Sequence, residues 1–201
     1  PIILIQDVIS VWIYRRVWDP WNLKVMIPGC VIGVGTAWLL AAYVSDVALR
    51  LVVGLIALGF VAYAFFRYLL PAEPPRPRAS HGVFWGALSG FTTTLIQIGA
   101  PPYYAFVLPQ RLEKMIYVGT TVMFFAAANT MKIVPYFALG QFSTAGLATS
   151  FALFPLAIAC NFLGIYLVRV TPEAMFYRIT NVIVLVLGLE LTRQGVMHLL
   201  K

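Results

Sequence analysis

The sequence predicts an all-α, polytopic integral membrane protein with about seven transmembrane segments, the first of them partial. Of the 201 residues, 61% are hydrophobic and only 10% are charged, and the mean hydropathy is +0.89, which is too apolar for a soluble domain. The apolar residues form runs that approach the ~20 residues a helix needs to cross a bilayer. Most of the 14 basic residues lie between or at the ends of these runs, where they indicate membrane orientation.

Composition and motifs also exclude several classes of function. The formal net charge is +7, but the chain offers no soluble basic face on which nucleic acid could bind. The sequence contains no GxGxxG, Walker A or HExxH motif and no Cys/His metal spacing, so we expect no enzyme activity, no cofactor and no metal site. Because the sequence carries no ATPase module, we expect any transport to be driven by a gradient or to be facilitated.

The first predicted helix, over residues 1–14, carries a carboxylate well inside it. Asp7 precedes Arg15 by eight residues, or ~12 Å of helical rise, which places it away from the interface. A carboxylate inside a membrane is costly and is a functional candidate by default, while a structural contact with a donor on a neighbouring helix is the alternative. The run is shorter than a full span, so we interpret it as the tail of a helix whose start is absent from the sequence.

The next predicted helices cover residues 25–44 and 47–68, and glycines in the first of them favour close packing. Residues 71–81 are proline-rich and polar, and we interpret them as a linker. The predicted domains are a truncated first helical repeat over 1–70, this linker, and a second helical repeat over 82–201 that contains a broken-helix binding region.

An uncharged run from Gly82 to Gln110 is the most informative stretch, because Gly99, Ala100, Pro101 and Pro102 interrupt it. Each proline lacks the N–H that would bond the carbonyl four residues back. In hydrocarbon, irregular backbone survives only where protein or a wet cavity surrounds it. Proline suits the first turn of a helix, so we expect a second short helix to begin at Pro101 or Pro102, with its positive end at the break. Such discontinuous helices mark the substrate sites of many secondary transporters.

Polar and small residues cluster around this break. Glycines at four-residue spacing, Gly82, Gly86 and Gly90, form a stripe suited to close helix contact. Hydroxyl and amide side chains lie on the same run and on the next predicted helix, which begins near Met115. Such groups serve either as helix-to-helix contacts or as a binding site, and their position beside two prolines favours the site. The predicted substrate-binding residues are Thr93, Gln97, Gly99, Pro101, Pro102, Gly119, Thr120, Thr121 and Asn129. Weaker candidates for proton coupling or gating are Asp7, Lys132 and Glu190.

The two halves show a weak internal similarity. Pro28 and Pro155 are 127 residues apart, as are Gly54 and Asn181, which gives limited support for a duplication. If the broken helix crosses the membrane, nine Lys and Arg residues fall on one side and five on the other, the five being Arg50, Arg111, Lys114, Arg169 and Arg178. This count predicts a cytoplasmic position for the Arg15 loop, the linker and the C-terminus.

Three segments in succession, GFTTTLIQIGAPP, YVGTTVMFF and NTMKIVPYFALGQ, resemble the sulfite exporter TauE/SafE family of membrane permeases. The resemblance extends more loosely over the whole chain, and it departs at Ala100, where the family often has a second glycine. It implies two similar four-helix halves, a multi-pass location in the bacterial inner (cell) membrane, and export of sulfite, sulfonates or related small anions.

The expected function is therefore a gradient-driven permease that exports a small anion such as sulfite or a short sulfonate. The alternative is a membrane scaffold or accessory subunit that keeps the permease fold and docks another membrane complex. Expected partners are the small-anion substrate and the lipid bilayer, without nucleic acid. Self-association and association with another membrane complex are left open.

Overall fold

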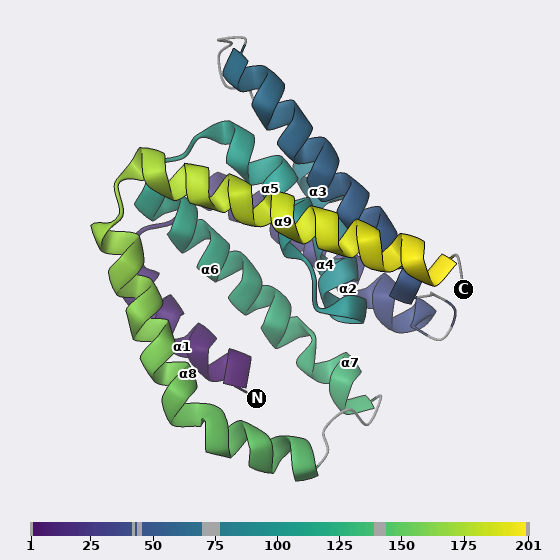
Figure 1. Cartoon of the computed structure of the whole chain (residues 1–201). Helices are drawn as coiled ribbons and strands as arrows, with labels where there is room; N and C mark the ends of the chain where they lie inside the picture. The colour runs from purple at the N-terminus through teal and green to yellow at the C-terminus, as the bar shows by residue number, and fades with distance from the viewer. Residues whose placement is uncertain (1, 42, 44–45, 70–76, 139–143, 200–201) are drawn as a thin grey trace. The chain divides into compact units, whose positions relative to one another are not determined.

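The computed structural model describes residues 2–41, 43, 46–69, 77–138 and 144–199, and every regular element among them is helical (Figure 1). In chain order the elements are α1 (Ile2–Tyr14), α2 (Pro20–Leu40), α3 (Asp46–Leu69), α4 (Ala79–Ile96), α5 (Ala100–Val107), the 3-10 helix η1 (Leu108–Gln110), α6 (Lys114–Met131), α7 (Ile133–Ala138), α8 (Thr144–Val170) and α9 (Glu173–Leu199). The all-α prediction is confirmed for this part of the chain.

Length and composition allow three of the described helices to cross a membrane, at Pro20–Leu40, Ala152–Val170 and Glu173–Met197. Ile2–Tyr14 and Val47–Phe60 are shorter apolar helices. The chain is thus a multi-pass membrane protein by its helices, although the predicted number of seven segments is not confirmed. The predicted linker lies largely outside the described residues, and its last three residues, 79–81, already belong to α4.

The start of α2 shows why the chain turns where it does. The Asp19 carboxylate accepts a 2.7 Å hydrogen bond from the backbone N–H of Asn22 and so caps the first turn of the helix. Pro20 occupies the first helical position, where a missing N–H costs nothing. The consecutive residues Asp19 and Pro20 therefore mark the start of α2 in the sequence.

The described chain divides into two compact units. Unit 1 comprises Pro1–Leu23 and Glu113–Phe176, and unit 2 comprises Lys24–Leu112 and Tyr177–Lys201. Each unit takes segments from both predicted repeats, so the compact units and the proposed repeats are different divisions of the chain. The division into repeats stays a prediction.

In unit 2, α4 and α5 form a helical hairpin. Their first and last turns meet, because a side chain built on Gly82 would lie 2.9 Å from the ring of Phe106. Their inner ends meet as well, because the Ser89 hydroxyl donates a 2.7 Å hydrogen bond to the Gly99 carbonyl. The predicted break is confirmed, but the assumption that the chain continues across the membrane after it is wrong: α5 runs back along α4.

Glycines set the contact between α2 and α4 in the same unit. A Cβ atom on Gly29 would lie 2.1 Å from the Val83 carbonyl oxygen, and one on Gly86 would lie 2.3 Å from the Met26 carbonyl oxygen. Each helix thus offers glycine to the carbonyls of the other, so the two backbones touch directly. The small-residue stripe predicted from the glycine spacing lies on α4, and it is confirmed as a helix contact.

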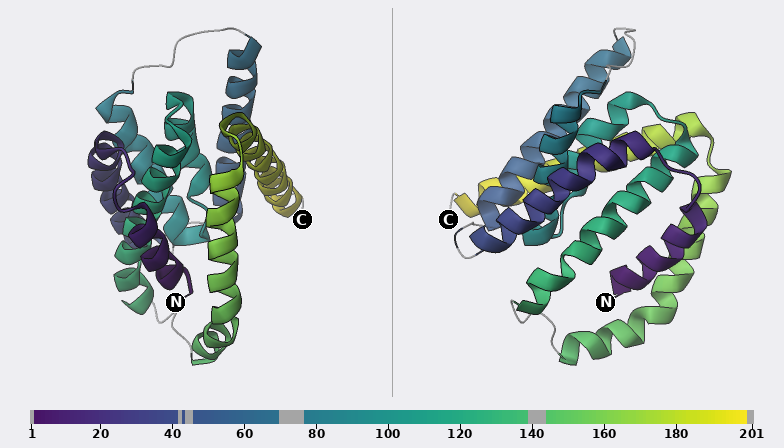
Figure 2. Two further views of the ribbon diagram at one scale, coloured as in Figure 1. Left: turned by 90° about the vertical axis from the view of Figure 1, so that its left-hand side faces the viewer. Right: turned by 180° about the vertical axis from the view of Figure 1, so that it is seen from behind.

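Two pairs of helices run antiparallel. In unit 1, α1 lies along α6, as the views of Figure 2 show, with Val17 opposite Gly119 and Asp7 opposite Asn129. In unit 2, α3 and α9 also run antiparallel, with Leu51 against Gly195 and Ala57 against Gly188. If each of the longer helices crosses the membrane, we expect the α4–α5 hairpin to enter and leave it on one side.

The re-entrant hairpin changes the predicted sidedness of the chain. If the longer helices cross the membrane, we expect nine basic residues of the described part of the chain on the side of the Arg15 loop, which are Arg15, Arg16, Lys24, Arg67, Arg78, Arg111, Lys114, Arg169 and Arg178. We expect three on the other side, which are Arg50, Lys132 and Arg193. This count again predicts a cytoplasmic Arg15 loop. The cytoplasmic C-terminus predicted for a crossing helix stays a prediction, because a re-entrant hairpin would place the end of α9 on the opposite side.

Candidate functional site

The tip of the α4–α5 hairpin is the first candidate site. Gln97 ends α4 in the left-handed conformation, with φ of 59°, and Gly99 precedes α5, which carries prolines in its first turn. This confirms the short helix expected to begin at the double proline. Gln97 is exposed at the tip, whereas Pro101 and Pro102 are buried. The prolines therefore pack the tip in place, and the glutamine is its accessible polar side chain.

Hydrogen bonds hold the Gly99 carbonyl from two directions. The Ser89 hydroxyl donates to it at 2.7 Å and the Tyr103 backbone N–H donates at 3.3 Å. A Cβ atom on Gly99 would come within 2.7 Å of Thr93, so this position has room for glycine only. Because the Tyr103 N–H is already used within α5, the backbone donors nearest the helix start are those of Gly99 and Ala100.

The predicted site residues on α6 make contacts within unit 1. The Thr120 hydroxyl donates to the Ile116 carbonyl at 2.7 Å and accepts the Asp19 backbone N–H at 2.8 Å. Gly119 faces the Val17 carbonyl oxygen, to which an added Cβ would come within 1.6 Å. The Thr121 hydroxyl donates to the Tyr117 carbonyl at 2.8 Å. These contacts fix the loop between α1 and α2 onto α6, and a substrate-binding role for the three residues stays a prediction.

Asp7, Asn129 and Lys132 come together in unit 1. The Asn129 side-chain amide donates a 2.7 Å hydrogen bond to Asp7 Oδ2, and the positive charge of Lys132 acts on the same carboxylate. Lys132 is buried, with 4% of its surface exposed. A groove of about 870 Å³ opens beside Asp7, lined by residues of α1 and by Ala126, Thr130, Ile133 and Phe162. The structure thus joins one predicted donor to two of the predicted coupling residues.

A polar ladder between α1 and α8 was not predicted from the sequence. Gln6 Nε2 donates to the Ala157 carbonyl at 3.0 Å, and the Ser10 hydroxyl donates to Asn161 Oδ1 at 3.2 Å. The Asn161 amide in turn donates to the Gln6 carbonyl at 3.2 Å. The sequence signal was available, because Gln6 and Ser10 are spaced by four residues on either side of Asp7 and so share a helix face.

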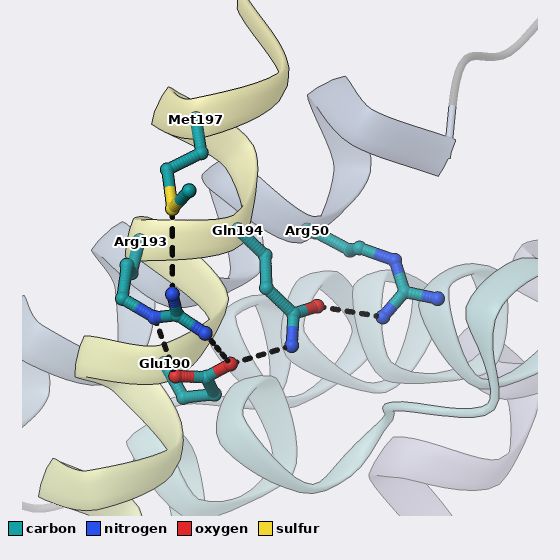
Figure 3. A network of polar contacts seen from close by, with 5 residues as sticks. All are labelled: Arg50, Glu190, Arg193, Gln194 and Met197. Carbon is teal, nitrogen blue, oxygen red and sulfur yellow. Dashed lines mark hydrogen bonds and ion pairs between the residues drawn. The ribbon is translucent and has the colours of Figure 1, made fainter.

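Glu190 lies elsewhere, in unit 2, within the polar network drawn in Figure 3. Its carboxylate accepts hydrogen bonds of 2.7 and 2.8 Å from the Arg193 guanidinium and one of 2.8 Å from the Gln194 amide. Gln194 also accepts a 3.2 Å bond from Arg50 on α3. The network ties the end of α9 to the start of α3, which is a structural use of this carboxylate.

Apolar helices, a helical hairpin with a polar tip and a carboxylate inside a helix are features of many membrane transport proteins. The family model "Sulfite exporter TauE/SafE" matches residues 1–191 of the chain. The protein therefore belongs to the TauE/SafE family of sulfite exporters, which are membrane permeases for sulfite or related anions. Comparison with curated proteins and with solved structures gives no significant match.

Proposed function

We propose that the protein exports a small oxyanion, such as sulfite or a short sulfonate, down its electrochemical gradient. The observation that carries this proposal is the α4–α5 hairpin, whose tip presents Gln97 next to the N-terminal end of α5. The positive end of a helix dipole favours an anion, and half-helix N-termini face anionic substrate groups in other transporters. Membership of the sulfite exporter family supports the same substrate class.

Neutral donors suit release as well as binding. The Gln97 amide and the backbone N–H groups of Gly99 and Ala100 would hold the anion through hydrogen bonds, without a fixed cation at the tip. The tip is rigid, because Ser89 and Tyr103 both bond the Gly99 carbonyl. Rigid donors need little reordering when a solute arrives, which lowers the entropic cost of binding.

Counterflow of radiolabelled sulfite in proteoliposomes tests the proposal. We expect Gln97→Ala to reduce the initial rate about tenfold, because a hydrogen bond to a charged group contributes about 1.5–3 kcal/mol. Gln110→Ala is the matched control, since the Gln110 amide donates to the Phe106 carbonyl at the other end of the hairpin.

The variants also separate the residues on α6 from the tip. Thr121→Val removes the hydroxyl of a predicted site residue on α6, and Thr36→Val is its control, because the exposed Thr36 hydroxyl donates to backbone carbonyls of its own helix, α2. Equal rates for Gln97→Ala and the unchanged protein would remove the tip from the mechanism. Absence of counterflow for sulfite and for sulfonates in the unchanged protein would favour the scaffold alternative.

A further inference from the structure

The Asp7 carboxylate in unit 1 has a neutral hydrogen-bond partner. Its Oδ2 atom accepts from the Asn129 amide at 2.7 Å. An amide can serve both states of a carboxyl group, because its NH2 donates to a carboxylate and its carbonyl oxygen accepts from a protonated acid. A change of charge at Asp7 therefore leaves neither group without a partner.

Asp7 is also open to its surroundings. It is half-buried and lines the groove of about 870 Å³ that α1 forms with parts of α6, α7 and α8. Glu190 differs, because its oxygens are taken by Arg193 and Gln194 and it does not line this groove. Of the two described carboxylates deep in apolar helices, Asp7 is the one placed to exchange a proton with the groove.

The charged groups around Asp7 can be named element by element. At the C-terminal end of α6 it is Lys132, whose charge acts on the carboxylate; α7, with the sequence IVPYFA, carries no charged side chain. On α8 the groups that face this part of α1 are the neutral Ala157 carbonyl and Asn161, and the charge of Arg169 acts on Tyr14 instead. Just after α1, Arg15 lines the same groove, eight residues beyond Asp7.

These surroundings suit a proton better than a metal ion. Hard cations require several oxygen ligands, whereas the side chains identified beside Asp7 on α6 present an amide donor and an ammonium group. Among the described residues there is no group of three His, Cys, Asp or Glu side chains that could hold a metal.

We propose that Asp7 binds and releases one proton in each transport cycle, so that anion movement is coupled to proton movement at the Asp7–Asn129 pair. The step adds a proton from groove water to a carboxylate oxygen and later returns it to water, and no other bond forms or breaks. While Asp7 is protonated, its O–H donates to the Asn129 carbonyl oxygen after the amide turns over. This inference rests on the proposed function, which it extends by naming the coupling ion.

The test uses the full chain in proteoliposomes with methanesulfonate, whose charge does not titrate near neutral pH. An outward methanesulfonate gradient is expected to move protons, reported by a pH-sensitive dye inside the vesicles. In Asp7→Asn we expect this proton signal to fall at least tenfold while methanesulfonate counterflow is retained. Glu190→Gln is the control and should keep both signals.

The possible results separate the coupling from the permease proposal. Counterflow without a proton signal in the unchanged protein would overturn the coupling and leave the permease proposal standing. A proton signal that survives in Asp7→Asn would also overturn it. Absence of counterflow in the unchanged protein would remove the permease proposal and the coupling with it.

Infrared difference spectra provide a measurement that does not depend on transport. When the pH is lowered, the unchanged protein should gain a carboxylic acid C=O band that Asp7→Asn lacks. A spectrum without a band assignable to Asp7 at any pH at which the protein stays folded would contradict proton binding there.

Discussion

The glycine contact between α2 and α4 allows a sharp test of the packing argument. In Gly33→Ala the new methyl carbon would lie 2.0 Å from the Ala87 carbonyl oxygen. Ordinary contact begins at 3.4 Å, so the two helices would have to move apart by about 1.4 Å. Overpacking of this kind costs about 1–3 kcal/mol, and the weak Cα–H···O contacts of a close crossing would be lost as well.

The matched control lies two residues further along the same helix. Gly35 has no atom within 4 Å of an added Cβ, so Gly35→Ala should be neutral or slightly stabilising, since alanine favours the helix more than glycine does. The free energy of unfolding in mixed micelles, followed by circular dichroism, measures both variants. Equal effects of the two substitutions would refute the direct backbone contact between α2 and α4.

Two further outcomes are expected from the fold. Single cysteines at Arg16 and Glu113, in a chain without Cys30 and Cys160, should react with an impermeant maleimide from the same side of the membrane; reaction from opposite sides would mean that the hairpin crosses. Thr120→Val should lower the free energy of unfolding by about 1–3 kcal/mol, because it leaves the Asp19 N–H without its acceptor, while Thr130→Val should change it little. Similar losses for both threonines would show that the Asp19 contact contributes nothing.

The sequence predicted the helices well, because apolar runs, prolines and glycines act locally. The start of the second short helix at the double proline follows from the missing N–H groups, and the glycine stripe on α4 follows from spacing alone. The direction of α5 could not be predicted, because a break ends a helix without fixing how the next one leaves. The Ser89 to Gly99 hydrogen bond and the Gly82 to Phe106 contact decide that direction, and both depend on tertiary packing.

The contacts of the candidate site residues also depend on tertiary packing, which the local sequence does not reveal. A threonine inside an apolar helix can face a solute or bond its own backbone, and sequence spacing does not distinguish the two. In the structure the Thr120 hydroxyl is used by Ile116 and Asp19. Asp7 and Asn129 are 122 residues apart in the sequence, so the local sequence around either residue could not reveal their hydrogen bond. What the sequence did show was that a carboxylate inside a helix needs a partner.

The interlocked glycine seam also restricts how the protein can move. Because Gly29, Gly33 and Gly86 each face backbone atoms of the other helix, no side chain at these three positions can change rotamer to let α4 swing away from α2. Any rocking motion that exposes Gln97 first to one side of the bilayer and then to the other must carry α2 along as part of one rigid body. Its pivots then have to be sought at the ends of that body, beginning with the turn that Asp19 and Pro20 build.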